Sequence, residues 1–331
     1  MRVERAADWH ALGLGEAEWN RLVERSRAPV PFATWQFQTT WHRAFTDGTL
    51  NLLAVQDGAG EWAGLLPLYE APEADGPVLR LVGGTDVADY LDLIAVSGRE
   101  EEVWKALLPA LAGLPPRRVD LRPVPAASPT PALLRTLAPA AGFTCRVDVE
   151  DRCPVIALPG SWDQYLATLS GKDRHELRRK LRRAAAGRPR IEAGRTPAEV
   201  GRLMDPFLAL HRRSKVGKAR FMDARMEGFF REVSTVLAAA GIAVVWVLWL
   251  EARPAAALVC LEYGGSVGVY NSGFDPDARA MSPGVVLIAR TIEDAIARRF
   301  QRYDFLRGEE VYKYGFGATP HEVVRVTLER T

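Results

Sequence analysis

One order of predicted elements occurs twice along this chain, and this repetition limits the fold more than any other sequence feature. In each half, three extended runs are followed by a helical pattern and then by one more strand. In the first half these elements are expected at residues 50–55, 62–69, 90–95, 101–111 and 118–122. In the second half they are expected at residues 244–250, 255–263, 266–272, 283–299 and 303–306. Strands and helices in this order indicate an α/β fold.

Short segments inside the two halves also match each other. Residues 118–122 (RVDLR) align with residues 302–306 (RYDFL), and each segment follows the helix of its half. The third extended run carries a tyrosine in both halves, Tyr90 in the first and Tyr270 in the second. Two interpretations are open: two copies of one α/β fold, or a chance similarity between two ordinary α/β units.

The length of the chain agrees with two domains. A chain of 331 residues exceeds the usual size of one domain and fits two of roughly 150 residues. The polar segment 148–152 and the Leu158-Pro159-Gly160 sequence suggest a boundary between them. We therefore predict an N-terminal domain over residues 1–152 and a C-terminal domain over residues 153–331.

Composition and charge exclude several classes of protein. Hydrophobic residues make up 48% and charged residues 25%, with a net charge of +2, so the overall charge calls for neither nucleic acid nor a membrane. The longest apolar run, 242–250, is about half the length of a membrane span. Because the N-terminus lacks the apolar core of a signal peptide, we expect a cytoplasmic protein. Three cysteines without CxxC spacing and five histidines without an HExxH motif predict no catalytic metal.

A strongly basic helix is expected after residue 161. Ser161 and Gln164 have the spacing of a capping box, and residues 172–183 carry seven basic side chains against two acidic ones. Since Leu177 and Leu181 form an apolar face, basic residues such as Arg178 and Arg179 must line another face. That face is either simply solvated or holds phosphates, from CoA, a nucleotide, a tRNA acceptor stem or a phosphorylated glycan.

A second candidate anion site lies at a predicted helix start. Ser282 is expected at the cap and Pro283 in the first helical position, while Gly284, which Val285 follows, leaves room near the backbone N–H groups. A strand, a loop and an uncluttered helix start can bind a pyrophosphate at the positive end of the helix dipole. The alternative is a capped helix that binds nothing.

Several segments of the second half resemble a known family. Residues 270–276, Ser282-Pro283-Gly284, residues 303–310 and Tyr312-Lys313 are similar to the closing half of the CelD-like, Fem-related acetyltransferases of bacteria, which belong to the GNAT superfamily. Residues 62–69, 89–92 and 172–183 extend the resemblance over most of the chain.

The resemblance implies a fold and a co-substrate. It implies tandem GNAT-like domains with mixed, mostly antiparallel sheets flanked by helices, and acetyl-CoA or another acyl-CoA bound by the second domain. It also implies a family role sometimes tied to exopolysaccharide or cell-envelope synthesis, whereas Fem-type relatives use aminoacyl-tRNA and peptidoglycan precursors. One departure is the missing [QR]-x-x-G-x-[GA] pyrophosphate loop, whose place Ser282-Pro283-Gly284 takes.

Acyl transfer needs a base for the acceptor, a polarised carbonyl and a proton for the leaving group. Glu309 or Asp304 is the candidate base, although Asp304 is also placed to cap or pair with a neighbouring arginine. Tyr270 and Tyr312 are candidate proton donors. Lys313 and Arg307 are candidates to hold a phosphate or the developing oxyanion. In the second half, the predicted catalytic residues are Tyr270, Glu309, Lys313, Tyr312 and Asp304, and the predicted donor-binding residues are Ser282, Pro283, Gly284, Val285 and Arg307.

Acceptor contacts are predicted from both halves. Asp89, Tyr90 and Asp92 either contact the acceptor or form a polar loop after Gly83-Gly84. Arg178 and Arg179 of the basic helix are the other candidates for contact with the acceptor.

The sequence leaves three classes of function open. The first is a CoA-dependent N- or O-acyltransferase acting on a small molecule or an envelope precursor. The second is an aminoacyl-tRNA-dependent transferase, with tRNA as the one nucleic-acid partner considered, and the third is a non-catalytic binding module.

Overall fold

The computed structural model describes residues 1–46, 48–214 and 216–331, which form two compact units. Unit 1 consists of Met1–Arg152 with His321–Thr331, and unit 2 consists of Cys153–Pro320. The predicted second domain ran to residue 331. The structure differs there, because Val323 and the residues that follow it pair with a strand of unit 1.

Unit 1 contains a mixed sheet with helices against it. Its strand order is β1-β2-β3-β4-β6-β13, in which the pairs β1–β2, β2–β3, β3–β4 and β6–β13 are antiparallel and the pair β4–β6 is parallel. Its elements are β1 (Arg2–Ala6), α1 (Glu16–Glu24), η1 (Pro31–Ala33), α2 (Trp35–Phe45), β2 (Leu50–Gln56), β3 (Trp62–Ala71), β4 (Val78–Leu81), β5 (Ile94–Ala95), α3 (Glu100–Ala112), β6 (Arg118–Pro125), α4 (Pro129–Leu137) and η2 (Pro139–Ala141). Two strands have residues in both units: β7 (Phe143–Ala157) and β13 (Thr319–Arg330).

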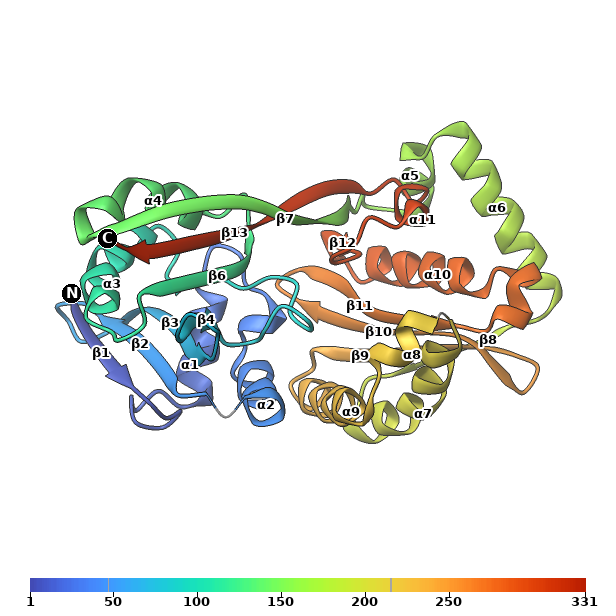
Figure 1. Ribbon diagram of the computed structural model, residues 1–331. Coiled ribbons are helices and arrows are strands. Elements are labelled where there is room, and N and C mark those ends of the chain that lie inside the picture. The colour runs from blue at the N-terminus through green and yellow to red at the C-terminus, as the bar shows by residue number, and fades with distance from the viewer. Residues whose placement is uncertain (47, 215) are drawn as a thin grey trace. The chain divides into compact units, whose positions relative to one another are not determined.

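Unit 2 repeats this arrangement with the strand order β7-β12-β11-β10-β9-β8, in which only β11–β12 is parallel. Helices α7 and α9 lie on one face of its sheet and α10 on the other (Figure 1). Its elements are α5 (Trp162–Thr168), α6 (Gly171–Ala186), β8 (Arg190–Gly194), α7 (Pro197–Ser214), α8 (Val216–Phe221), α9 (Ala224–Ala239), β9 (Ala243–Leu250), β10 (Arg253–Tyr263), β11 (Ser266–Phe274), η3 (Pro276–Met281), α10 (Pro283–Ala297), β12 (Arg302–Asp304) and α11 (Val311–Tyr314).

Strand register shows that the two matching segments occupy the same place in the fold. Asp120 lies opposite Arg80 in the parallel pair of unit 1, and Asp304 lies opposite Gly268 in the parallel pair of unit 2. Each pair joins the last strand of an antiparallel run, β4 or β11, to the strand that follows α3 or α10, which is β6 or β12. The predicted fold class, two α/β copies with mostly antiparallel sheets, is confirmed.

Two predicted elements are wrong in detail. The third strand of the first half is β4, not residues 90–95, of which only Ile94–Ala95 is extended in a sheet. Tyr90 is therefore not the counterpart of Tyr270, because it lies in a loop whose Leu91 N–H donates to the carbonyl of Pro123 at 2.8 Å. The helix that starts after Ser161 is in fact two helices, because Ser170 begins α6 by accepting a bond from the Asp173 N–H at 3.1 Å.

The core of unit 2 fixes the position of α10. Leu287 and Ile292 of α10 are fully buried in one apolar cluster with Leu258 and Cys260 of β10. On the other face, α7 crosses β11 at Gly273, where an added Cβ would lie 2.4 Å from the backbone nitrogen of His211. Only glycine allows this backbone approach. Strand β11 is thus held firmly between two helices.

Candidate functional site

The first feature of the site is a β-bulge in β11. Val259 of β10 lies opposite Asn271, but the next residue, Cys260, lies opposite Val269, so Tyr270 is the extra residue. The Tyr270 ring stacks on Phe230 of α9 with centroids 5.2 Å apart. Bulges re-aim side chains and are common beside active sites. The bulge sets Tyr270 off the regular ladder.

The second feature is the separation of β11 from β12. These strands pair only from Ser266 to Gly268, and no later register pair joins them in the part of the chain that the structure describes. Beyond Asp304 the chain follows β7 instead, since the Phe305 N–H donates to the carbonyl of Pro154 at 2.9 Å. Oδ1 of Asp304 accepts a bond from the Leu306 N–H at 2.7 Å. The edge of β11 that carries Tyr270 is therefore not covered by β12.

The third feature is the start of α10. Ser282 occupies the cap position as predicted, but its backbone is left-handed (φ 50°, ψ 47°) and its side chain makes no capping hydrogen bond. Pro283 is buried in the first turn, which contains no acidic residue. A Cβ on Gly284 would meet only Cβ of Phe274, at 3.9 Å. The first turn, which includes Val285, thus keeps an uncompensated positive dipole end beside open space.

Lys313 lies in α11, and its side chain has a structural role that the sequence did not indicate. Its side chain is buried, and its ammonium, which has three N–H donors, lies within hydrogen-bond distance of four consecutive backbone carbonyls, Phe305 at 3.3 Å, Leu306 at 3.4 Å, Arg307 at 3.0 Å and Gly308 at 2.8 Å. Oε2 of Glu310 lies 2.9 Å away. The charge of Lys313 is therefore used to hold the loop after β12.

The other predicted residues of this segment lie around that loop. Tyr312 is 41% exposed, and its ring meets the Phe305 ring edge-on with centroids 6.2 Å apart. Glu309 is exposed and accepts a hydrogen bond from the Tyr314 hydroxyl at 3.0 Å. Arg307 is half-buried, between the positive-φ residues Leu306 and Gly308.

The basic helix α6 reaches from this segment to the start of α10 (Figure 1). At the beginning of α6, Asp173 lies close to Gly315. A Cβ atom added to Gly315 would be 4.0 Å from Oδ1 of Asp173. Near its end, Nη1 of Arg183 donates to the carbonyl of Ala280 in η3 at 3.1 Å. Arg179 is paired with Glu176 through two bonds of 2.7 Å, whereas Arg178 is exposed.

Comparison with known proteins agrees with this geometry. A family model described as an acetyltransferase (GNAT) domain matches residues 171–314, which include α6, β11, α10 and the loop held by Lys313. The chain carries a GNAT domain. The resemblance seen in the sequence is thereby confirmed, and the matched GNAT domain lies within unit 2. A search of curated proteins by sequence finds no match.

Solved structures share the whole fold at low identity. The chain is similar to FemX, with 12% identity, a TM-score of 0.71, and 98% of this chain and 96% of FemX covered. It is similar to the C-terminal domain of a putative lysylphosphatidylglycerol synthetase from Agrobacterium fabrum, with 10% identity, a TM-score of 0.60 and coverage of 94% and 90%. A tandem GNAT protein from the clavulanic acid biosynthesis pathway has 15% identity, a TM-score of 0.53 and coverage of 100% and 99%. These similarities establish a tandem GNAT fold.

Unit 1 lacks the features that the GNAT domain of unit 2 has. Its helix α3, the counterpart of α10, begins with three glutamates, Glu100, Glu101 and Glu102. These carboxylates already compensate the helix dipole and would repel a phosphate. Asp120, the counterpart of Asp304, is fully buried and accepts two bonds from Arg325 at 2.8 and 2.9 Å. In unit 1, therefore, charged side chains occupy the positions that correspond to the start of α10 and to the surroundings of Asp304 in unit 2.

The predicted acceptor residues Asp89, Tyr90 and Asp92 lie in unit 1, in the loop between β4 and β5. Asp89 and Tyr90 are half-buried. Asp92 contacts the Ser128 hydroxyl and accepts a bond from the Leu93 N–H at 2.7 Å. Burial of its carboxyl raises the pKa of Asp92 to about 6, against the opposing effect of these bonds. The other predicted site residues belong to unit 2.

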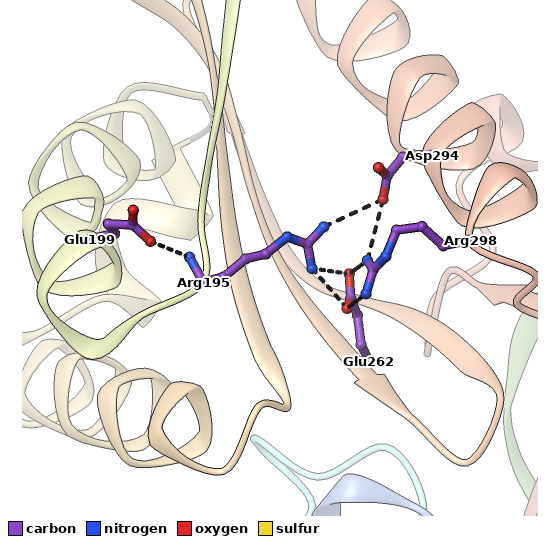
Figure 2. Close-up of polar contacts among 5 residues, drawn as sticks. All are labelled: Arg195, Glu199, Glu262, Asp294 and Arg298. Atoms are coloured by element: carbon purple, nitrogen blue, oxygen red, sulfur yellow. Dashed lines mark hydrogen bonds and ion pairs between the residues drawn. The ribbon is translucent and has the colours of Figure 1, made fainter.

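An ionic cluster at another part of the GNAT domain escaped the sequence analysis (Figure 2). Glu262 of β10 has a side chain only 6% exposed and is bound by Arg195 at 2.9 Å and by Arg298, the residue that follows α10, at 2.5 Å. Asp294 lies 3.4 Å from Arg195 and 3.3 Å from Arg298. The sequence feature that could have indicated this cluster is Glu262, because it is a glutamate in an otherwise apolar strand. The cluster ties α10 to β10 and to the segment that precedes α7.

Within residues 1–46, 48–214 and 216–331, no group of three or more histidine, cysteine, aspartate or glutamate side chains has an arrangement that could hold a metal ion. No helix in these same ranges combines the length and the apolar character that a membrane crossing requires.

Proposed function

We propose that the GNAT domain transfers an acyl group, as acetyl or a longer chain, from acyl-CoA to an amine or hydroxyl acceptor. The observation that carries this proposal is the start of α10, which is uncapped by Ser282, free of acidic residues, and open at Gly284. Such a helix start binds phosphate oxygens through backbone N–H groups and the helix dipole. The Arg307 side chain is proposed as a further contact for the donor.

The bulge in β11 supplies the second part of the proposed site. It sets the Tyr270 side chain off the regular ladder, beyond the last register pair of β11 with β12. A thioester bound with its pyrophosphate at α10 and its carbonyl at β11 would be held for attack.

The proposed reaction needs no covalent enzyme intermediate. The acceptor nitrogen or oxygen attacks the thioester carbon, the C–S bond breaks, and the electron pair leaves with the sulfur. Glu309 is proposed to take the acceptor proton, because its carboxylate is exposed, whereas Asp304 is engaged by the Leu306 N–H. Tyr270 is proposed to give its phenolic proton to the departing thiolate, with Tyr312 as the alternative donor.

The proposed acceptor is a small molecule or a precursor of the cell envelope. The basic side chains Arg178 and Arg179 of α6 are proposed to contact it, while a role of Asp89, Tyr90 and Asp92 stays a prediction from the sequence. The envelope-related acceptor is the one that the sequence resemblance to Fem-related acetyltransferases implies, and the fold of the chain is similar to that of FemX. Lys313 is proposed to act indirectly, by holding the loop that carries Arg307 and Glu309.

A second candidate is an aminoacyl-tRNA-dependent transferase. The observation that favours it is the same likeness to FemX together with exposed arginines on α6. Phosphate contacts to RNA make affinity fall steeply with salt. Titration of tRNA at two salt concentrations, on the wild-type chain and on a triple alanine variant of Arg178, Arg179 and Arg182, tests this candidate. A salt-dependent affinity that the variant loses would support it.

The experiment that tests the proposed function is a thermal-shift panel of acyl-CoA thioesters, followed by thiol release in the presence of candidate amines. A ligand that binds only the folded state raises the melting temperature. We expect acetyl-CoA or a longer acyl-CoA to raise it, and Tyr270→Phe to reduce turnover while keeping the shift. The proposal fails if no acyl-CoA shifts the melting temperature. The third class, a non-catalytic module, requires binding without any thiol release.

A further inference from the structure

The ring of Tyr270 is stacked on a side chain of the helix that lies against its strand. Tyr270 is the extra residue of the β11 bulge, where the ladder is locally disrupted. Its ring lies on the ring of Phe230 in α9, with centroids 5.2 Å apart and planes inclined by 26°. Stacking of two aromatic rings favours one relative orientation of the pair. The direction of the Tyr270 side chain is therefore tied to a side chain of α9.

Phe230 is itself held in place by other aromatic rings. Phe230 is 1% exposed. The rings of Phe229 and Phe221 meet the Phe230 ring edge-on, with centroids 5.8 and 6.1 Å away and interplanar angles of 84° and 74°. A closely packed ring keeps one rotamer, because another rotamer would leave a void or produce a clash. Phe230 thus offers the phenol ring a fixed surface.

Helix α9 is attached to α7, and α7 is attached to β11. The Arg212 guanidinium of α7 donates to the carbonyl of Met222 at 3.2 Å and contacts the Glu227 carboxylate in the first turn of α9. The Phe274 N–H of β11 donates to the hydroxyl of Ser214, the last residue of α7, at 2.8 Å. Because these contacts join both helices to β11, they keep the Phe230 ring beside the bulge.

We infer that Phe230 is a positioning residue for the proton donor Tyr270. This inference rests on the proposed function and deepens it, since it names the side chain that aims the phenol at the leaving group. In the step concerned, the C–S bond of the thioester breaks, the thiolate takes the phenolic proton, and the phenolate recovers a proton from water. Proton transfer requires the phenol oxygen within hydrogen-bond reach of the sulfur. A misplacement of about 1 Å can lower a rate by up to about 100-fold.

The test follows thiol release from acetyl-CoA with hydroxylamine as the acceptor, because this small amine is largely unprotonated at neutral pH. The full chain is compared as wild type, Phe230→Leu, Tyr270→Phe and the double variant. We expect Phe230→Leu to lower kcat about tenfold and to leave the KM for acetyl-CoA unchanged. Tyr270→Phe should lower kcat about 100-fold. The double variant should be no slower than Tyr270→Phe, since Phe230 acts only through the phenol.

Phe207→Leu provides the matched control. Phe207 lies in α7, is fully buried, and has its ring beside that of His211, with centroids 5.7 Å apart. The same loss of a buried ring there should lower the melting temperature and leave kcat at the wild-type value. If Phe230→Leu does not fold, Phe230→Met takes its place, because methionine fills a similar volume without a flat ring.

Two results would overturn the inference and leave the proposed function standing. The first is a wild-type kcat in Phe230→Leu or in Tyr270→Phe. The second is a double variant slower than Tyr270→Phe by the whole factor that Phe230→Leu shows alone, because the effect of Phe230 would then be independent of the phenol. A wild type that releases no thiol above the uncatalysed rate would overturn the proposed function itself.

Discussion

The ammonium group of Lys313 lies 2.8 Å from the carbonyl oxygen of Gly308, and the same nitrogen reaches the carbonyls of the three preceding residues. This interaction explains how a loop with positive φ at Leu306 and Gly308 is kept in one conformation after β12. The positive charge is compensated by Glu310 at 2.9 Å. Lys313 therefore acts as a scaffold for the loop.

Replacing Lys313 with methionine should destabilise the protein. The change leaves four carbonyls and the Glu310 carboxylate without their common partner, and the loss of such a buried, charge-assisted set costs about 3 kcal/mol. Urea unfolding followed by circular dichroism measures this. Lys172→Met, at an exposed position of α6, should leave the midpoint unchanged. A Lys313→Met protein with wild-type stability and no activity would instead place Lys313 in the chemistry directly.

The ionic cluster around Glu262 gives a second prediction. Glu262→Ala removes the buried carboxylate that binds Arg195 and Arg298 and leaves Asp294 to compensate both, so we expect a loss of about 2 kcal/mol in unfolding free energy. The matched change Glu293→Ala breaks the exposed pair with Arg290 and should have little effect. Chemical denaturation of both variants makes the comparison. Equal losses would mean that the cluster contributes no more than a surface pair.

Asp92 gives a prediction about pH. Burial raises its pKa in the folded state to about 6, above the ordinary value of 3.8. Between these values the folded state binds the proton more tightly than the unfolded state, so this group lowers stability as pH rises from about 4 to about 6. The difference corresponds to about 3 kcal/mol. We expect the stability of Asp92→Asn, relative to wild type, to increase over this range and then level off.

The pH experiment needs its own control. Asp163→Asn, at an exposed position of α5, should give a profile of unfolding free energy against pH that runs parallel to the wild type. Parallel profiles for Asp92→Asn and wild type between pH 4 and 7 would show that the Asp92 carboxyl ionises in the folded state as it does in the unfolded state.

Local sequence patterns were enough to predict much of the fold. The apolar runs of β2, β3, β9, β10 and β11 and the helical patterns of α3 and α10 fall where they were expected. The match between residues 118–122 and 302–306 predicted the duplication, because both segments form the parallel strand after the central helix. Backbone periodicity is a local property, and these elements depend on it.

Other features depend on partners far away in the sequence. Strand β13 pairs with β6, with Leu328 opposite Val119. The local pattern of neither strand indicates which strand it pairs with. The bulge at Tyr270 is a one-residue shift of register that alternation alone does not show. Lys313 was expected to bind a phosphate because its charge was visible in the sequence, while its real partners are backbone carbonyls, which every residue has.

Gly284 allows the central claim to be tested by one measurement, the affinity of CoA for Gly284→Glu. A carboxylate in the first turn favours the helix dipole but repels phosphate, as the three glutamates of α3 would. Gly284→Ala, whose Cβ meets only Phe274 at 3.9 Å, is the steric control. Isothermal titration should show CoA bound by the wild type and by Gly284→Ala, and at least about tenfold weaker binding by a stably folded Gly284→Glu. Undiminished binding of CoA by Gly284→Glu would contradict a pyrophosphate site at the start of α10.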